Sequence, residues 1–246
     1  MIDWSPLRSA LARCRADNIS VPIWWRDDDA IEPSAALRRL SNLASDLHIP
    51  AHLAVIPAHA QNSLVPVIND DPFLHPLVHG WAHHNTAPQG QKKSEFGVPR
   101  EQAILDATRA LTRMQTLFGK QLIAMFVPPW NRIDAALVSE LKSAGYGALS
   151  TFGPRSNTLN IAQINTHIDP IFWRGHRGLV DPNDVIEQTV TMLDARRISA
   201  QDASEPLGYL THHLVHDDPI WDFSRGILSE LQNGGATCVT MKDYIK

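Results

Sequence analysis

The sequence predicts an α/β fold in which helices cover a largely parallel sheet, either open or closed into a barrel. Segments with strand and helix patterns alternate along the chain. Most candidate strands are short apolar runs without polar alternation, which is typical of parallel strands buried on both faces. The 246 residues contain no internal repeat, low-complexity tract or linker, so we expect one domain spanning 1–246.

Apolar runs define the expected strands, and apolar residues at helical spacing define the helices. A helix over 5–17 precedes the strand 21–25, which stops at the charged cluster Arg26-Asp27-Asp28-Asp29. The remaining elements are, in order, a helix at 34–47, strands at 51–57 and 77–81, a helix between Pro99 and Gly119, a strand at 123–127, a helix at 133–144, strands at 146–152 and 161–168, a helix at about 183–195, a strand at 207–215, a helix at 219–232 and a strand at 236–240.

Composition and charge exclude several classes of function. The net charge of −4 and the pI near 6.3 give no electrostatic reason to expect nucleic acid or an anionic membrane as a partner. The two cysteines, Cys14 and Cys238, form neither a disulfide framework nor a CxxC metal site, and no apolar run suits a signal peptide or a membrane span. We therefore expect a cytoplasmic protein. The phosphate-binding, dinucleotide-binding and serine-hydrolase motifs are also absent.

Polar residues interrupt the apolar plan repeatedly at the carboxyl ends of expected strands, which is where α/β enzymes place their active sites. The segments concerned are Asp27–Asp29 after 21–25, His79 and His83 around the end of 77–81, 128–132 after 123–127, Asp169 after 161–168, and His212 and His213 near 207–215. Five such placements predict one shared polar rim.

His79-Gly-Trp-Ala-His83 is the most informative of these segments. Its i, i+4 spacing places two imidazoles on one side of a turn, and two histidines with one carboxylate form a zinc site that leaves a position open. A bound cation would also relieve the repulsion within the aspartate triplet. The alternatives are surface histidines and a triplet that lies in a solvated loop or caps the following helix.

Hydrolysis requires a base and an acid beside the metal. A second aspartate of the triplet can take a proton from water, and His212 can protonate a leaving amine with Asp169 as its orienting partner. Asp169 precedes Pro170 and can instead begin a turn, and His212, His213 and His216 can each be structural.

These segments resemble the motifs of the polysaccharide deacetylases, the NodB-homology or carbohydrate esterase family 4 group, over about 21–245. The resemblance implies a deformed (β/α)7 barrel, one divalent metal ion, most often zinc, and removal of acetyl groups from N-acetylated sugars. The matching segments are WWRDDDA, HGWAH, FVPPWNR, IDPIFW with Asp169 and Trp173, and Leu210-Thr211-His212. The implied site has Asp29, His79 and His83 as metal ligands, Asp28 as base, His212 and Asp169 as further catalytic residues, and Pro129, Trp130 and Arg132 as substrate contacts.

The chain departs from the family pattern at two positions. The triplet allows either Asp27/Asp28 or Asp28/Asp29 as the base and ligand pair, and we favour the second. The third motif normally begins with an arginine that steadies the base, but Val127 stands there, so Arg26 or Arg132 is expected to substitute.

Two features bear on the substrate. Five tryptophans lie near the rim motifs, and of these Trp24 and Trp25, within a strand, are expected to pack the barrel interior. The aperiodic segment 86–99 is expected to form a loop that sets specificity. The leading hypothesis is a deacetylase of an N-acetylated sugar or glycoconjugate precursor. The alternatives are a metal-dependent hydrolase of a non-sugar amide and a degenerate barrel that binds carbohydrate without catalysis.

Overall fold

A parallel sheet lies at the centre of the computed structural model, which describes residues 2–156 and 160–245. The strand order is β6-β5-β4-β3-β2-β1-β7, and β8 pairs with β1 off this path. Every pair of strands is parallel, as the sequence predicts. The strands are β1 Pro22–Ala30, β2 Ala51–Val55, β3 Leu74–His79, β4 Met125–Val127, β5 Ala148–Leu149, β6 Ala162–Gln163, β7 Leu207–Thr211 and β8 Thr237–Cys238.

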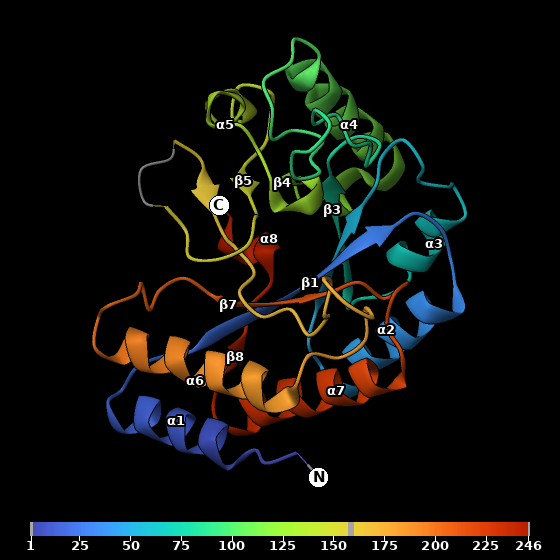
Figure 1. Ribbon diagram of the computed structural model, residues 1–246. Helices are drawn as coiled ribbons and strands as arrows, with labels where there is room; N and C mark the ends of the chain where they lie inside the picture. The colour runs from blue at the N-terminus through green and yellow to red at the C-terminus, as the bar shows by residue number, and fades with distance from the viewer. Residues whose placement is uncertain (1, 157–159, 246) are drawn as a thin grey trace.

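Helices flank the sheet and join successive strands. Figure 1 shows α1, α6 and α7 grouped on one side of the molecule, with α4 and α5 beside the other half of the sheet. The short α3 was not predicted, because six residues that include Pro66 are too few to show a helical period. The helices are α1 Ser5–Ala16, α2 Ala35–Leu47, α3 Leu64–Asn69, α4 Ala103–Phe118, α5 Ala135–Leu141, α6 Pro182–Arg197, α7 Asp218–Asn233 and α8 Met241–Tyr244, with 3-10 turns η1 Gly119–Gln121 and η2 Pro129–Asn131.

The sheet closes on itself through an irregular seam beyond β6. Ile168 forms a parallel bridge with Tyr209 of β7, and the Leu210 N–H donates to the Ile168 carbonyl at 2.8 Å. At Gly208 an added Cβ would lie 2.4 Å from the Asn165 carbonyl oxygen, so glycine permits this close approach of the two backbones. The fold is therefore the deformed (β/α)7 barrel that the sequence resemblance implies.

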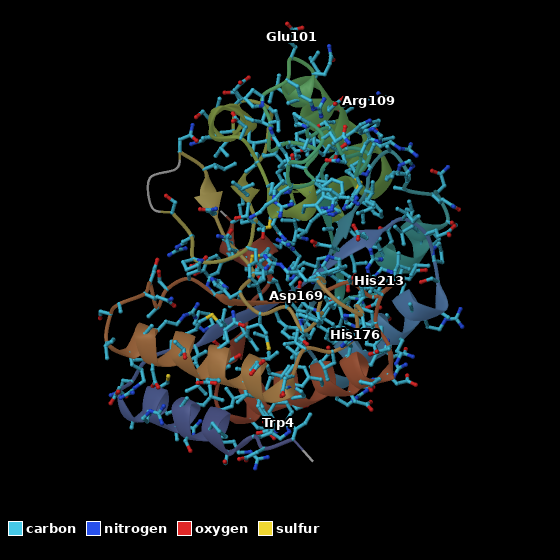
Figure 2. The ribbon with its side chains drawn as sticks, in the orientation of Figure 1. Trp4, Glu101, Arg109, Asp169, His176 and His213 are labelled. Atoms are coloured by element: carbon cyan, nitrogen blue, oxygen red, sulfur yellow. The ribbon has the colours of Figure 1, made fainter. Side chains whose placement is uncertain are left out.

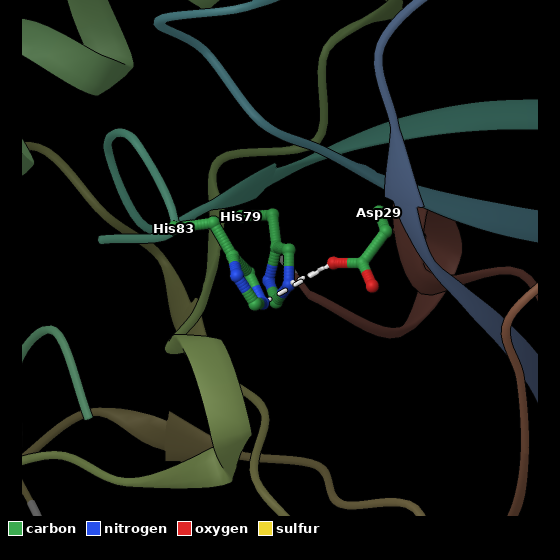
Figure 3. A group of neighbouring side chains, drawn as sticks. All are labelled: Asp29, His79 and His83. Carbon is green, nitrogen blue, oxygen red and sulfur yellow. Dashed lines mark hydrogen bonds and ion pairs between the residues drawn. The ribbon is translucent and has the colours of Figure 1, made fainter. Parts of the chain in front are cut away.

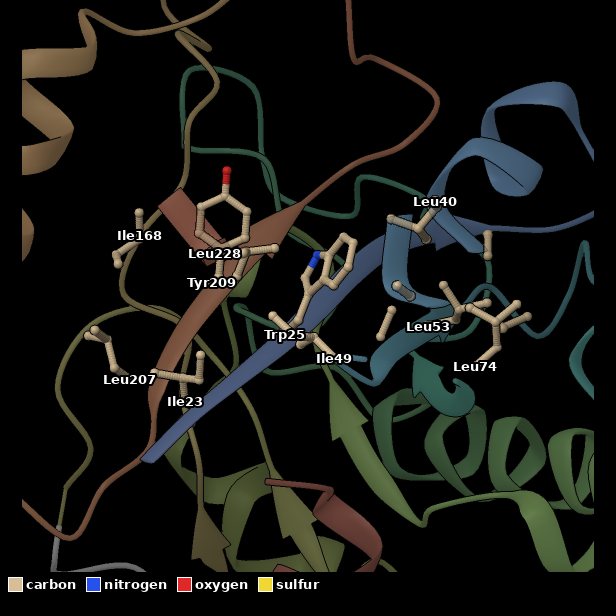
Figure 4. Packing of buried hydrophobic residues seen from close by; sticks show 14 of the residues in the cluster. Ile23, Trp25, Leu40, Ile49, Leu53, Leu74, Ile168, Leu207, Tyr209 and Leu228 are labelled. Carbon is tan, nitrogen blue, oxygen red and sulfur yellow. The ribbon is translucent and has the colours of Figure 1, made fainter. Parts of the chain in front are cut away.

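Apolar side chains fill both sides of the curled sheet. Trp25 is fully buried in the larger cluster, between the strands and the helices (Figure 4). Trp24 points to the opposite face of β1 and packs with residues of β2 to β5 in a smaller cluster. Both tryptophans are core residues, although only Trp24 belongs to the cluster inside the barrel.

β1 is longer than the sequence predicts, because it continues through the charged cluster to Ala30 instead of stopping at Trp25. Its second half pairs with β2 on one side and with β7 on the other, which satisfies its backbone. The charges are tolerated inside the sheet because Asp27 pairs with His213 and Asp28 with Arg26. In the described part of the chain, no helix is long and apolar enough to cross a membrane.

Candidate metal centre and active-site cleft

A cleft of about 920 Å³ lies at the carboxyl ends of the strands, as the polar interruptions in the sequence predict. Most of the predicted site residues line it: Asp28, Asp29, His79, His83, Trp130, Arg132, Asp169 and His212. Pro129 lies beneath this surface. It is buried, and its ring lies where a side chain on Gly80 would be. Pro129 thus supports the loop that follows β3.

Asp29, His79 and His83 bring three ligand atoms together within 4.8 Å of one another. The Oδ1 atom of Asp29 lies 3.1 Å from Nε2 of His79 and 3.3 Å from Nε2 of His83 (Figure 3). One carboxylate and two imidazole nitrogens are ligands that zinc accepts, and the open cleft leaves space for a further ligand. The geometry therefore suits a divalent cation.

An irregularity near the end of β1 places Asp29. The pairing register between β1 and β2 shifts between Asp28 and Ala30, and Asp29 has a φ of +75°. Three other non-glycine residues that line the cleft, His83, Trp130 and Asn131, have φ values of 53° to 57°. Such left-handed conformations are uncommon outside glycine and often gather at functional sites. The bulge also explains why adjacent aspartates have different surroundings.

His79 is held in the tautomer that a metal ligand needs. Its Nδ1 donates to the Val127 carbonyl at 3.0 Å, which leaves Nε2 free to face Asp29. Burial disfavours the charged imidazole, but Asp28 and the hydrogen bond with Asp29 outweigh burial and raise the pKa of His79. Burial and the neighbouring His79 lower the pKa of His83. Burial likewise opposes ionisation of Asp29, yet its contacts with the histidines lower its pKa.

Glu95 is a supporting residue that the sequence analysis did not identify. Its carboxylate is buried and accepts hydrogen bonds from the backbone N–H groups of Trp81 at 3.2 Å, Ala82 at 2.8 Å and His83 at 3.1 Å. A Cβ on Gly80 would come within 2.5 Å of Glu95 Oε2. The loop that carries His83 is thus fixed by a buried carboxylate. No sequence pattern indicated this, because the partners are backbone amides.

Arg26 contacts the carboxylate of Asp28 from within β1. It is fully buried, its Nε lies 2.9 Å from Asp28 Oδ1, and its Nη2 donates to Asp28 Oδ2 at 3.0 Å. The same guanidinium donates to Asn131 Oδ1 and Ser150 Oγ, each at 2.7 Å. Arg132 instead donates to the backbone carbonyl of Lys93 at 2.5 Å. Of the two arginines considered from the sequence, Arg26 is the one that orients Asp28.

Asp27 faces away from the cleft. Its carboxylate pairs with His213 Nδ1 at 2.5 Å and accepts from the Thr211 hydroxyl at 2.6 Å. Burial opposes its ionisation, but His213 and Thr211 lower the pKa of Asp27. The geometry therefore favours the Asp28/Asp29 pair over the Asp27/Asp28 pair. His213, labelled in Figure 2, is buried beside Asp27 and is not among the residues that line the cleft.

His212 approaches the other side of Asp28. Its Nε2 lies 3.9 Å from Asp28 Oδ2, and its ring meets the Trp173 ring edge-on at 4.7 Å between centroids. Asp169 accepts from Trp173 Nε1 at 2.7 Å and from the Ile171 N–H at 2.9 Å, so it both forms the turn and positions Trp173. Burial raises the pKa of Asp169, although the charge of His212 and the bond from Trp173 oppose this shift. Among the described contacts, no hydrogen bond joins His212 to Asp169, and His212 Nδ1 is buried without a partner.

Solved structures decide which fold this is. No model of a known protein family matches the sequence, and no curated protein matches it. A Streptococcus mutans CE4 esterase matches with a TM-score of 0.60 at 12% identity, over 94% of this chain and 90% of its own. A family 4 carbohydrate esterase from Streptomyces lividans in complex with acetate matches with a TM-score of 0.53 at 15% identity, over 89% and 92% of the two chains.

The chain has the family 4 carbohydrate esterase fold. A CE4 family pseudoenzyme from Bacillus anthracis also shares this fold, with a TM-score of 0.61 at 11% identity over 92% of this chain and 66% of its own. The resemblance inferred from the motifs is thus confirmed for the architecture. The presence of a pseudoenzyme among the similar structures means that activity has to be argued from the residues of this cleft.

Proposed function

We propose that this protein is a divalent-metal-dependent deacetylase that hydrolyses the amide of an N-acetylated sugar. The observation that carries the proposal is the convergence of Asp29, His79 and His83 in the cleft, with Asp28 beside them and oriented by Arg26. The esterase fold and the acetate-bound structure with the same fold support a reaction at an acetyl group.

The donor set fits a zinc ion. His79 already presents Nε2, and a cation between the three ligand atoms would replace the proton that they share in its absence. When bound, the ion supplies Lewis acidity, which polarises an acyl carbonyl and makes a neighbouring water more acidic. Asp29, His79 and His83 would hold the ion, as proposed from the sequence.

The remaining residues then have separate tasks. Asp28 accepts the proton of the attacking water, and Arg26 holds its carboxylate in one orientation through two contacts. His212 lies on the other side of Asp28 and donates a proton to the leaving amine. Asp169 keeps Trp173 against the ring of His212, which limits the orientations of that imidazole. Trp130 and Arg132 line the cleft where a sugar would lie.

The test is acetate release from N-acetylated monosaccharides and chito-oligosaccharides by the zinc-loaded full chain. We expect turnover that is lost with a chelator, restored with zinc and abolished in the Asp28→Asn variant. Turnover of only linear or cyclic non-sugar amides would show that the substrate is not a sugar. Sugar binding without turnover in the zinc-loaded protein would show that this chain, like the pseudoenzyme, is not a catalyst.

A further inference from the structure

Four basic side chains line the cleft. Lys93 belongs to the segment that follows β3, and Arg132 belongs to the segment that follows β4. Arg174 and Arg177 come from the segment after Asp169. Within the described residues, none of the four makes an ion pair with a carboxylate. This is notable in a chain whose net charge is −4.

The four basic side chains differ from the other arginines of the protein in that they line one cleft together. Of the thirteen arginines outside this group, eight have a carboxylate partner within 4.0 Å: Arg8, Arg13, Arg26, Arg39, Arg100, Arg155, Arg197 and Arg225. The other five are spread over the chain and do not line the cleft. The three carboxylates that line the cleft are already engaged. Asp28 pairs with Arg26, Asp29 with His79 and His83, and Asp169 accepts from Trp173 and Ile171. The four basic side chains therefore lack a counter-ion among the described residues.

The segment that carries Arg174 and Arg177 has a defined conformation. Ile171 and Leu179 form an antiparallel bridge, and the Phe172 N–H donates to the Gly178 carbonyl at 2.9 Å. Trp173 within the turn is tied to Asp169 at 2.7 Å. In the segment after β4, the Arg132 side chain is fixed by its hydrogen bond to the Lys93 carbonyl. The backbone segments that carry these basic groups thus have defined positions along the cleft.

Exposed aromatic rings lie among these cations. The side chains of Trp173 and Phe152 are 41% and 43% exposed and line the same cleft as Trp130. Aromatic faces suit the apolar faces of a sugar ring, and guanidinium groups bind phosphate or carboxylate through paired hydrogen bonds. We propose that the substrate is an N-acylated amino sugar that carries an anionic group, a phosphate or a carboxylate, bound by Arg174 and Arg177 with Lys93 and Arg132.

This inference rests on the proposed deacetylase function and is tested with matched substrates. The zinc-loaded full chain is given N-acetylglucosamine, N-acetylglucosamine 6-phosphate and N-acetylmuramic acid, which differ in their charge. We expect about a tenfold or larger preference in kcat/KM for at least one anionic sugar, expressed mainly in KM and weakened by added salt. A preference for the phosphate or for the carboxylate identifies which anion the cleft takes.

The variant is the double substitution Arg174→Gln and Arg177→Gln, with Arg38→Gln on α2 as the control. Arg38 is exposed and, among the described residues, makes no ion pair. The double variant should reduce the preference to about threefold or less without changing turnover of the neutral sugar, and the control should keep it. Equal kcat/KM for neutral and anionic sugars, or equal loss in the Arg38 variant, would overturn the inference and leave the deacetylase function standing.

Absence of turnover on every substrate would instead refute the proposed function. In that case calorimetric titration with glucosamine and glucosamine 6-phosphate still tests whether the cleft binds an anionic group. Tighter binding of the phosphate that the double variant loses would support an anion site. Binding that does not depend on charge would overturn it.

Discussion

The substitution of Glu95 by glutamine or alanine probes how the loop that carries His83 is held. Glu95 is buried and accepts hydrogen bonds from three consecutive backbone N–H groups, those of Trp81, Ala82 and His83. Its Oε2 atom serves Trp81 and His83, and Oε1 serves Ala82. The His83 backbone has a φ of +53°, so the loop is held in a conformation that it would not favour alone.

The magnitude follows from these three bonds. Hydrogen bonds to a charged acceptor contribute about 1.5–3 kcal/mol each, and a buried donor left without a partner costs about 1–3 kcal/mol. Glutamine can keep its oxygen at the Oε2 position, but its NH2 group then faces the Ala82 N–H. We expect Glu95→Gln to lower the free energy of unfolding by about 1–2 kcal/mol, because mainly the Ala82 bond is lost, and Glu95→Ala by about 4–5 kcal/mol, the low end of the range for three bonds. Loss of support for a metal ligand should weaken zinc binding about 10- to 100-fold.

Two measurements test this. Urea unfolding gives the free energy, and zinc competition with a chromogenic chelator gives the Kd. The control is Glu101→Gln, an exposed carboxylate outside the cleft (Figure 2), which should leave both quantities unchanged. The reasoning is refuted if Glu95→Gln, folded as well as the wild type, binds zinc with unchanged affinity.

Two further predictions concern buried charges. Arg26→Gln leaves Asp28 buried without its partner and should lower the free energy of unfolding by about 3–5 kcal/mol. Arg26→Lys should still bind zinc but lose about tenfold in kcat, measured by acetate release. A wild-type kcat in the lysine variant would contradict the role of Arg26 in orienting Asp28. His52 is buried, its Nδ1 donates to the Trp25 carbonyl and its Nε2 accepts from the Met241 N–H, and burial with the nearby His75 lowers its pKa to about 3. The unfolded chain binds the His52 proton more readily than the folded chain. The free energy of unfolding should therefore fall as pH decreases from about 6.5 towards 3, by up to about 1.4 kcal/mol per pH unit. His52→Gln should flatten this part of the curve, and an unchanged pH slope in the variant would show that other groups cause the pH dependence.

The sequence predicts those helices and strands well whose formation depends on burial of apolar side chains. The apolar run at β2 and the helical spacing in α4 and α7 place these elements close to their observed bounds, whereas β3 begins at Leu74 and not at residue 77 as expected. β1 extends further than expected because the apolar pattern ends at Trp25, while the pairing continues on compensated charges. The closing seam at Ile168 and Tyr209 is one bridge with a few hydrogen bonds, which leaves no periodic signal in the sequence.

The candidate site is predictable to the extent that it depends on spacing. The i, i+4 pair His79 and His83 needs only local geometry, and the structure brings both to Asp29. Three adjacent aspartates are indistinguishable by type, so the β-bulge at Asp29 and the His213 contact of Asp27 are needed to separate them. Glu95 acts through backbone amides and could not be found from residue types alone.

The central claim is most directly tested by titrating zinc into metal-free protein while acetate release is followed. The account predicts that activity rises with zinc and saturates at one equivalent. It also predicts that Asp29→Asn, His79→Ala and His83→Ala neither bind this equivalent nor turn over substrate, whereas His84→Ala, at an exposed neighbouring position, behaves like the wild type. Full activity without metal, or zinc binding that survives all three ligand substitutions, would contradict it.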